Sequence, residues 1–284
     1  MTGKLDHFTR QFRQSYGPWA LVAGASEGLG AAFADALASR GLNLVLVARR
    51  AALMQTLAGQ LVEKYAVQVR SLSLDLACPE STRRIVDETE GLEIGLLVYN
   101  AAYSMVGPFL DQPLEDHLRE VDTNVRTPLQ LVEVFGKRML RNGHGGIILM
   151  TSLSAIQGSA YISTYSATKA FNINLAEGLW EEWRREGVDV LACIAGAIRT
   201  PNYLASSPRK TGRLSDATIE PETVVTEALA ALGRQPSVIP GTLNRVSSFV
   251  MRRLFSRRAA IQIMGSVLRK MYVHEESTQL ERKS

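Results

Sequence analysis

The feature that most constrains this chain is a regular alternation of short apolar runs with longer amphipathic segments. The apolar runs, which predict strands, lie at 19–24, 42–48, 69–75, 95–100, 145–152, 188–196 and 237–241. The intervening segments, which predict helices, lie at 28–40, 50–64, 78–90, 114–141, 162–186 and 221–233. Strands that are apolar on both faces and separated by helices indicate a parallel sheet covered on both sides. We therefore expect a doubly wound α/β fold with about seven parallel strands.

The chain predicts one domain followed by a helical extension. Its 284 residues are 46% hydrophobic, which is enough to bury the core of one large domain. No linker rich in Pro, Gly or Ser interrupts the alternation before about residue 240. We therefore expect a catalytic domain at 1–240 and an extension at 241–284.

The extension is strongly basic. From Ala228 to His274 the chain has no Asp or Glu, and paired arginines alternate with apolar positions over 244–272. We expect the apolar face to pack on the domain or on a second subunit while the arginines face water. A helix lying on an anionic membrane surface is the alternative. Nucleic acid is not an expected partner, because aromatic residues do not interleave the basic run and no recognised module is present.

Several other protein classes are disfavoured by composition. The first 19 residues are polar, and no stretch holds 18 uninterrupted apolar residues, so we expect a cytoplasmic protein without a membrane span. Cys78 and Cys193 are too few and too far apart to suggest a disulfide framework. The four histidines lack the spacing of metal ligands, so we expect no metal site.

A glycine-rich turn follows the first predicted strand. Glycine allows a tight turn and a close approach of an anion, and the start of the next helix offers unpaired N–H groups with a positive dipole end. The turn therefore predicts a pyrophosphate site, although an ordinary strand-to-helix turn is the alternative. The residues expected to line this site are Gly24, Ser26, Glu27, Gly28, Leu29 and Gly30.

The end of the second predicted strand favours NADP(H) over NAD(H). An acidic side chain near this point binds the ribose hydroxyls of NAD, whereas a basic one accommodates the 2′-phosphate of NADP. Here Ala48 is followed by Arg49 and Arg50. We assign the phosphate to Arg49, whose guanidinium carries a permanent charge in a fork geometry. The alternative is that both arginines are solvated residues at the start of a helix, and it fits Arg50 better than Arg49.

The stretch YSATK places Tyr165 and Lys169 four residues apart in a predicted helix, and therefore on one face. A nearby ammonium favours the phenolate, so we expect Lys169 to lower the tyrosine pKa from its usual value of about 10. On these two residues alone, a half-buried tyrosine beside a solvated lysine would be the simpler interpretation.

Together these motifs resemble the short-chain dehydrogenases/reductases over about residues 19–227. Ser152 precedes Tyr165 by thirteen residues (165 − 152), which is the family's usual gap. The remaining matches follow consecutive strands or lie in the long fourth helix, and they are Asp75, Leu76, Asn100, Ala101, Asn124, Ile198 and Thr200. The resemblance implies a Rossmann fold, NADP(H) as cofactor and cofactor contacts at all of these positions except the catalytic Asn124.

The resemblance also implies the roles of four catalytic residues. Ser152 would hold the substrate carbonyl oxygen, and Tyr165 would supply the proton as hydride arrives. Lys169 would bond the nicotinamide ribose, and Asn124 would hold an ordered water that links Lys169 to solvent. A neighbouring backbone bond for Asn124 and a helix-cap role for Asp75, which the family uses to bind adenine, are the alternatives.

The sequence departs from the family pattern at several supports. Ala23 stands where the family has threonine, and residues 99–102 read Tyr-Asn-Ala-Ala instead of Asn-Asn-Ala-Gly, so two polar ties beneath the cofactor are expected to change. Ala195 replaces the usual proline after the sixth strand, which should loosen that turn slightly. Glu27 places a carboxylate near the expected phosphates.

The sequence indicates less about substrate recognition than about the cofactor and the catalytic residues. The polar segment 201–222 is consistent with a mobile lid over the cofactor. Six side chains lie where the family builds a mostly apolar pocket, although several of them are as well explained as core: Tyr103, Met105, Phe109, Gln157, Tyr161 and Tyr203.

We therefore predict an NADPH-dependent carbonyl reductase, reversible as an alcohol dehydrogenase, that acts on a moderately apolar ketone or aldehyde. A 3-oxoacyl, steroid-like or other lipid-like substrate is the leading expectation. A non-catalytic NADPH-binding sensor or scaffold is the alternative, and it is disfavoured because Ser152, Tyr165 and Lys169 are all retained. The resemblance also implies a homo-oligomer that pairs the fourth and fifth helices.

Overall fold

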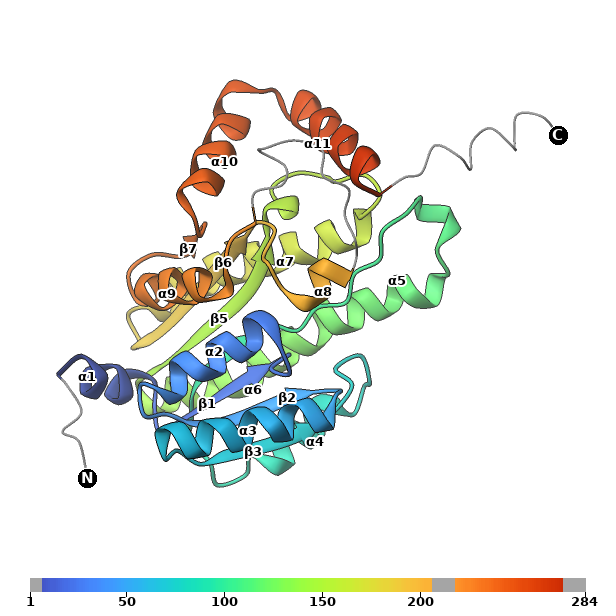
Figure 1. The fold of residues 1–284 in the computed structure, drawn as a ribbon. Coiled ribbons are helices and arrows are strands. Elements are labelled where there is room, and N and C mark those ends of the chain that lie inside the picture. The colour runs from blue at the N-terminus through green and yellow to red at the C-terminus, as the bar shows by residue number, and fades with distance from the viewer. Residues whose placement is uncertain (1–6, 206–217, 273–284) are drawn as a thin grey trace, which may run out of the picture.

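A computed structural model of the chain describes residues 7–205 and 218–272. The described strands form one parallel sheet in the order β3-β2-β1-β4-β5-β6-β7 (Figure 1). The strands are β1 (Trp19–Ala23), β2 (Asn43–Ala48), β3 (Val69–Ser73), β4 (Ile94–Tyr99), β5 (Gly145–Ser152), β6 (Val188–Ala195) and β7 (Ser237–Val238). All seven predicted strands are confirmed, and the doubly wound Rossmann fold with them. The seventh is much shorter than predicted.

The helices agree with the predicted pattern in position, with additions at both ends. They are α1 (His7–Tyr16), α2 (Gly28–Ala38), α3 (Ala51–Tyr65), α4 (Ser81–Glu88), α5 (Leu114–Val121), α6 (Thr127–Asn142), α7 (Ser163–Trp183), α8 (Pro201–Ala205), α9 (Pro221–Ala231), α10 (Thr242–Leu254) and α11 (Arg257–Tyr272). The predicted helix 114–141 is α5 and α6 joined by a π-helical turn at Asp122–Arg126. Most of the predicted lid, at 206–217, lies outside the described residues.

Side chains of the strands alternate between two buried clusters, one on each face of the sheet. On one face, Val22 packs with Phe33 of α2 and Val224 of α9, and α3 completes the layer. On the other face, Leu21 packs with Phe135 of α6, and α4 and α7 complete the layer. Burial of whole strands in this way explains their continuous apolar sequences.

Helix α1 was not expected from the polar start of the chain. The side chains of Phe12 and Tyr16 are nevertheless buried with 7% and 8% exposure and join the cluster around α2. The Tyr16 hydroxyl donates to Asp189 Oδ2 of β6 over 2.7 Å. Two apolar residues four positions apart were sufficient to dock a short amphipathic helix, a signal too sparse to stand out in a polar segment.

The carboxyl ends of the strands lie together along one edge of the sheet. The strand order reverses between β1 and β4, and such a switch point opens a crevice in which α/β proteins bind ligands. Beyond β7, α10 rises away from the sheet and α11 turns back, so that Arg269 Nε donates to the Tyr161 hydroxyl over 2.8 Å (Figure 1). Within the described ranges, no helix combines the length and apolar character needed to cross a bilayer.

Candidate active site

The glycine turn between β1 and α2 has the geometry of an anion site. Gly24 has φ of +81°, and a Cβ placed on it would lie 2.7 Å from the Ala101 Cα. A Cβ on Gly30 would lie 2.0 Å from the Gly24 carbonyl oxygen, so only glycine fits there. Helix α2 begins at Gly28, and the side chain of Glu27 makes no cap bond to it. The first N–H groups of α2 are therefore left for a ligand, which fits the phosphates of a dinucleotide.

The arginine pair after β2 is arranged differently from the prediction. Arg50 Nη2 lies 2.6 Å from Glu27 Oε1 and donates to Ser26 Oγ over 2.9 Å, so Arg50 joins the glycine turn rather than facing water alone. It also neutralises the carboxylate that the sequence placed near the phosphates. Arg49, which we predicted to bind the phosphate, has an exposed side chain, and its carbonyl accepts from Ser73 Oγ. Sequence reasoning gave no signal for these contacts of Arg50, because Ser26 and Glu27 lie 24 and 23 residues away in the chain.

Asp75 and Leu76 follow β3 at the same edge of the sheet. Asp75 Oδ1 accepts from the Ala77 N–H over 3.0 Å, and Oδ2 accepts from Arg119 Nη2 of α5 over 2.5 Å. Burial acts to raise the pKa of Asp75, but these two hydrogen bonds outweigh it and the net shift is downward. The Leu76 carbonyl accepts from Thr127 Oγ1 over 2.7 Å. The local turn at Ala77 and the bond to α5 hold Asp75 in place, and its adenine contact stays a prediction.

The end of β4 keeps polar ties to its neighbours despite the sequence departures. Asn100 Nδ2 donates to the Gly24 carbonyl over 2.9 Å, and the N–H groups of Asn100 and Ala101 both donate to the Ala23 carbonyl. The buried Tyr99 hydroxyl donates to the Thr123 carbonyl over 2.5 Å. These bonds tie β4 to the glycine turn and to the π-helical turn, so the unusual residues change the ties without removing them.

Ser152, Tyr165 and Lys169 meet where β5 ends and α7 begins. Ser152 Oγ accepts from the Ser154 hydroxyl over 2.9 Å, and it acts on the nearby Tyr165 by lowering its pKa. Lys169 is 2% exposed, its Nζ donates to the Met150 carbonyl over 2.9 Å, and the same Nζ lies 5.8 Å from the Tyr165 ring centroid. The structure thus brings the three predicted residues together.

The protonation of this group differs from the prediction. Burial raises the pKa of Tyr165 to about 12, while Ser152 acts to lower it and the charge of Glu120 to raise it. Burial also lowers the pKa of Lys169 to about 8. The expectation that Lys169 holds the tyrosine pKa below its usual value is therefore wrong for this structure, because burial raises that pKa by more than Ser152 lowers it.

Asn124 lies in the π-helical turn and its side chain is fully buried. Its Oδ1 accepts from the Tyr103 N–H over 2.9 Å, and its Nδ2 donates to the Tyr103 carbonyl over 2.8 Å and to Thr168 Oγ1 over 3.1 Å. Its carbonyl accepts from Asn172 Nδ2 over 2.9 Å. The side chain thus makes the backbone bond that we considered as the alternative, and the water-holding role stays a prediction.

Glu120 is a site residue that sequence reasoning missed. It precedes Asn124 by four residues, is 2% exposed, and its Oε1 accepts from the Met105 N–H over 2.7 Å. Burial raises its pKa, although the Met105 bond acts against this. Glu120 and Asn124 together hold the segment after β4. The sequence pattern gave no signal, because the apolar Leu114 and Leu118 of α5 are exposed while Glu120 is buried.

The segment after β6 closes the other side of the glycine turn. Ile198 forms an isolated parallel bridge with Ile219, and the Thr200 N–H donates to the Ile198 carbonyl over 2.8 Å. A Cβ on Gly28 would lie 3.0 Å from Thr200 Cγ2. Ile198 and Thr200 therefore lie beside the predicted phosphate site, as their assignment as cofactor contacts requires.

The predicted pocket residues divide between different surroundings. Met105, Phe109 and Tyr161 line one small hollow of about 10 Å³, which Glu120 also lines. The Tyr103 hydroxyl donates to Asp116 Oδ1 over 3.1 Å. Gln157 instead lines a much larger cavity beside α10, and Tyr203 lies on α8. Three of the six predicted residues thus gather within reach of the catalytic group.

Comparison with known proteins leads to the same family as the sequence motifs. The family described as "short chain dehydrogenase" matches residues 18–210. A 7beta-hydroxysteroid dehydrogenase from Collinsella aerofaciens is 32% identical over 261 residues, which cover 90% of this chain and 98% of that protein.

Solved structures agree as well. One, from work on the stereoselectivity of 7beta-hydroxysteroid dehydrogenase, is 31% identical with a TM-score of 0.85 and covers 89% of this chain and 99% of its own. A short-chain dehydrogenase from Sphingobium yanoikuyae in complex with NADPH is 28% identical with a TM-score of 0.73, and it covers 84% of this chain and 94% of its own. With matches of this extent around an intact catalytic group, the chain belongs to the short-chain dehydrogenase family.

Proposed function

We propose that this oxidoreductase is an NADPH-dependent carbonyl reductase, reversible as an alcohol dehydrogenase, whose substrate is a moderately apolar, steroid-like ketone. The observation that carries the proposal is the grouping of Ser152 and Tyr165 beside buried Lys169, whose Nζ lies 5.8 Å from the tyrosine ring centroid. The steroid class is supported by similarity to the Collinsella 7beta-hydroxysteroid dehydrogenase. A 3-oxoacyl or other lipid-like substrate is the second candidate, favoured by the apolar Met105 and Phe109 near the catalytic group.

The cofactor is NADP(H), and the chain has groups that suit each of its parts. The glycine turn and the uncapped start of α2 suit the pyrophosphate, and Ile198 and Thr200 lie beside it. Arg49 and Arg50 place two permanent positive charges after β2, where a 2′-phosphate is accommodated. When bound, the nicotinamide supplies or accepts the hydride.

Tyr165 is suited to act as general acid. With a pKa of about 12, it keeps its proton at neutral pH and can donate it to the alkoxide that develops on a ketone oxygen. Ser152 holds the same oxygen through its hydroxyl, so both groups stabilise charge that forms only in the transition state. In the reverse direction, alcohol oxidation requires the phenolate as base.

Lys169 and Asn124 position this pair. The bond from Lys169 to the Met150 carbonyl fixes the ammonium beneath the tyrosine, where a nicotinamide ribose would lie. Asn124 and Glu120 fix the backbone at Tyr103 and Met105, which borders the substrate side. A sensor or scaffold without turnover would not require this convergence of four buried polar groups, which favours the enzyme over that alternative.

We propose a homo-oligomer in the cytoplasm, with the catalytic domain at 1–240 and the extension at 241–284. Leu129 of α6 and Phe171 of α7 are 42% and 36% exposed, which supports pairing of these two helices between subunits. The exposed free thiol of Cys78 fits a reducing compartment. A peripheral membrane contact of the extension is the alternative use of its apolar residues.

The test of the activity is NADPH consumption with a panel of 7-oxo steroids, 3-oxoacyl thioesters and small ketones, with the alcohol identified by mass spectrometry. We expect turnover of at least one apolar ketone, lowered by about 10²-fold or more in Tyr165→Phe. Tyr65→Phe is the matched control, because it removes a phenol of α3 that bonds Asp35 and lines neither the small hollow nor the larger cavity. Equal rates in wild type and Tyr165→Phe, or no turnover across the panel, would favour the sensor alternative.

The test of cofactor choice is binding of NADPH and NADH to Arg49→Ala and Arg50→Ala. We expect each substitution to weaken NADPH binding while leaving NADH binding within about twofold, because only NADPH carries the 2′-phosphate. Arg84→Ala on α4 is the charge-matched control. Loss of both cofactors in Arg50→Ala would instead assign Arg50 to the pyrophosphate turn that it contacts.

A further inference from the structure

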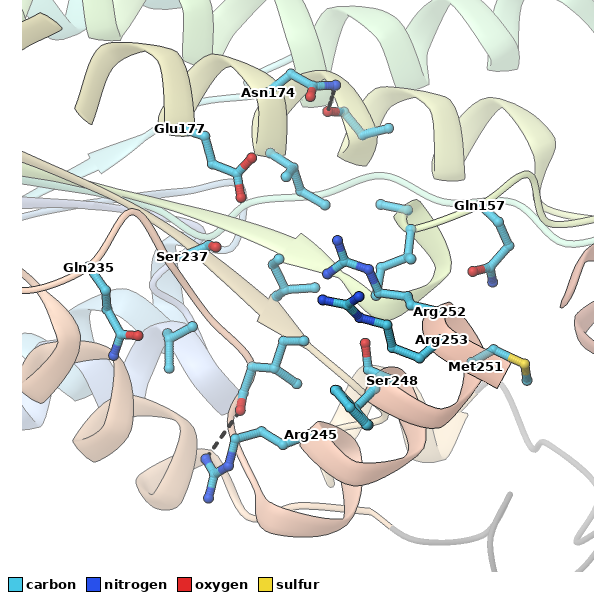
Figure 2. A pocket seen from close by; sticks show the side chains of 18 of the residues that line it. Gln157, Asn174, Glu177, Gln235, Ser237, Arg245, Ser248, Met251, Arg252 and Arg253 are labelled. Atoms are coloured by element: carbon cyan, nitrogen blue, oxygen red, sulfur yellow. Dashed lines mark hydrogen bonds between the residues drawn. The ribbon is translucent and has the colours of Figure 1, made fainter. Parts of the chain in front are cut away.

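A large open cavity lies between the catalytic domain and α10, and the catalytic machinery does not use it. It has a volume of about 1290 Å³. One wall is α7, a second is the β7 edge with the end of α9, and the third is α10 with the start of α11 (Figure 2). Ala155, Ile156 and Gln157, from the loop between Ser152 and Tyr165, form part of its floor. Pockets for drug-sized ligands measure roughly 300–1,000 Å³, so the space is large enough for a small-molecule ligand.

The cavity carries an excess of positive charge. Five arginines and two glutamates line it, which leaves three net positive charges (5 − 2). Arg245 is paired with Glu227 over 2.5 Å. Arg252 and Arg253 form no ion pair or hydrogen bond with any residue in the described ranges, and Figure 2 shows both guanidinium groups directed toward the middle of the hollow. An excess of unpaired guanidinium groups around a concave surface favours a bound anion.

Ser248 is a second, independent polar feature of the same wall. It is 6% exposed, and its hydroxyl has no hydrogen-bond partner in the described part of the chain. It precedes Arg252 by four residues on α10, so both side chains lie on the same face of the helix. Buried hydroxyls are almost always hydrogen bonded, and a rotation about χ1 would bring this one toward the cavity.

The wall opposite α10 is mostly apolar. It includes Ala170 and Ile173 of α7, Ile194 at the end of β6 and Ile239 after β7, together with the polar side chains of Asn174 and Glu177. An occupant would therefore meet guanidinium and hydroxyl groups on one side and hydrocarbon, interrupted by Asn174 and Glu177, on the other. Among the described residues, Glu177 is the only carboxylate at this cavity that has no arginine partner.

We propose that this cavity is a second binding site for an amphipathic anion, with its carboxylate or similar head group on Ser248, Arg252 and Arg253 and its apolar body against Ala170 and Ile173. The site is separate from the reaction proposed above and does not depend on it. A free monomeric amphiphile fits better than a bilayer, because the charged and apolar groups face one another across a concavity rather than lie on one convex surface.

The experiment is calorimetric titration of the full-length protein with decanoate, kept below its aggregation concentration, and with decan-1-ol as its uncharged counterpart. We expect decanoate to bind at least tenfold more tightly than decanol. The double substitution Arg252→Gln with Arg253→Gln should weaken decanoate at least tenfold, and Ser248→Ala should weaken it two- to fivefold.

The matched control is the double substitution Arg84→Gln with Arg258→Gln, which removes the same charge outside the cavity and should leave decanoate affinity within twofold. NADPH affinity and circular dichroism establish that each variant is folded. Decanoate binding that survives loss of Arg252 and Arg253, or that a ketone substrate displaces completely, would place the ligand in the catalytic pocket and overturn the proposal.

Two further measurements separate other occupants. Vesicles of phosphatidylglycerol and phosphatidylcholine test for a bilayer, and sedimentation equilibrium tests for a second copy of the chain. Vesicle binding without decanoate binding would overturn the proposal in favour of a membrane surface. Conversion of an oligomer to a monomer by the Arg252 and Arg253 substitutions, again without decanoate binding, would overturn it in favour of a subunit interface.

Discussion

At the scale of residues, burial decides the protonation of the catalytic group. The spacing of Tyr165 and Lys169 was enough to predict that they share a face, because helical geometry is local. The direction of the tyrosine pKa was predicted wrongly, because the sequence reveals neither how completely α7 is covered nor that Glu120 lies nearby. Arg50 was missed for a similar reason, since its contacts with Ser26 and Glu27 form only in the folded chain.

Lys169 should cost the protein stability at neutral pH. Its pKa is about 8 when folded and 10.5 when exposed, so between these values the unfolded chain binds a proton that the native state does not, and stability rises with pH. We expect Lys169→Met to raise the free energy of unfolding by up to about 3 kcal/mol at pH 7, an increase that is reduced by the loss of the hydrogen bond to Met150. This increase should disappear by pH 10. Urea unfolding at both pH values measures this, with exposed Lys137→Met as control. An advantage that grows with pH would contradict it.

Glu120 should tune the proton donor. Glu120→Gln keeps an oxygen for the Met105 N–H but removes the negative charge that raises the Tyr165 pKa. We expect the pH profile of alcohol oxidation, which requires the phenolate, to move to lower pH. Asp116→Asn, on the same helix but bonded to Tyr103, is the control and should leave the profile in place. An unchanged profile in Glu120→Gln would show that this charge does not reach the tyrosine.

At the scale of elements, hydrophobic periodicity predicted the strands and most helices, because burial on both sheet faces leaves a strong pattern. It did not reveal the π-helical turn at Asp122–Arg126, although Pro128, just after it, cannot donate a helical hydrogen bond and marks a break in the predicted helix. Nor did it reveal α1, whose docking depends on Phe12, Tyr16 and a distant partner, Asp189. Tertiary contacts of this kind have no local signature.

The docking of α1 can be tested by removing the hydroxyl group of Tyr16. Tyr16→Phe leaves the half-buried carboxylate of Asp189 without its donor, so we expect a loss of about 1–3 kcal/mol in the free energy of unfolding. Tyr65→Phe is the matched control, because it removes a bond to the more exposed carboxylate of Asp35 and should cost less than about 1 kcal/mol. Equal losses in the two variants would mean that α1 contributes little.

The glycine turn can be tested through its tightest contact. Gly30→Ala places a methyl group 2.0 Å from the Gly24 carbonyl, so the turn must open. We expect NADPH affinity to fall at least tenfold, because the displaced N–H groups no longer converge on the phosphates. Gly178→Ala on α7, where a Cβ meets nothing within 4 Å, is the control for which we expect unchanged affinity. Near-normal binding in Gly30→Ala would remove the turn from the cofactor site.

At the scale of the whole molecule, the parallel sheet brings the ends of β1, β4, β5 and β6 to one edge, and residues predicted for catalysis and cofactor binding lie there. This convergence was predictable, since it follows from the order of strands and helices. The placement of α10 and α11 was not, because their apolar residues do not indicate which surface they face. The cavity beneath them therefore became visible only in the folded chain.

The most direct test of the central claim is transfer of deuterium from NADPH labelled at C4 of the nicotinamide to a reduced ketone, followed by mass spectrometry in wild type and Tyr165→Phe. The account predicts one deuterium on the carbinol carbon in wild type and a loss of labelled product of about 10²-fold or more in the variant. Unlabelled alcohol, or labelled alcohol formed equally by Tyr165→Phe, would contradict hydride transfer assisted by this site.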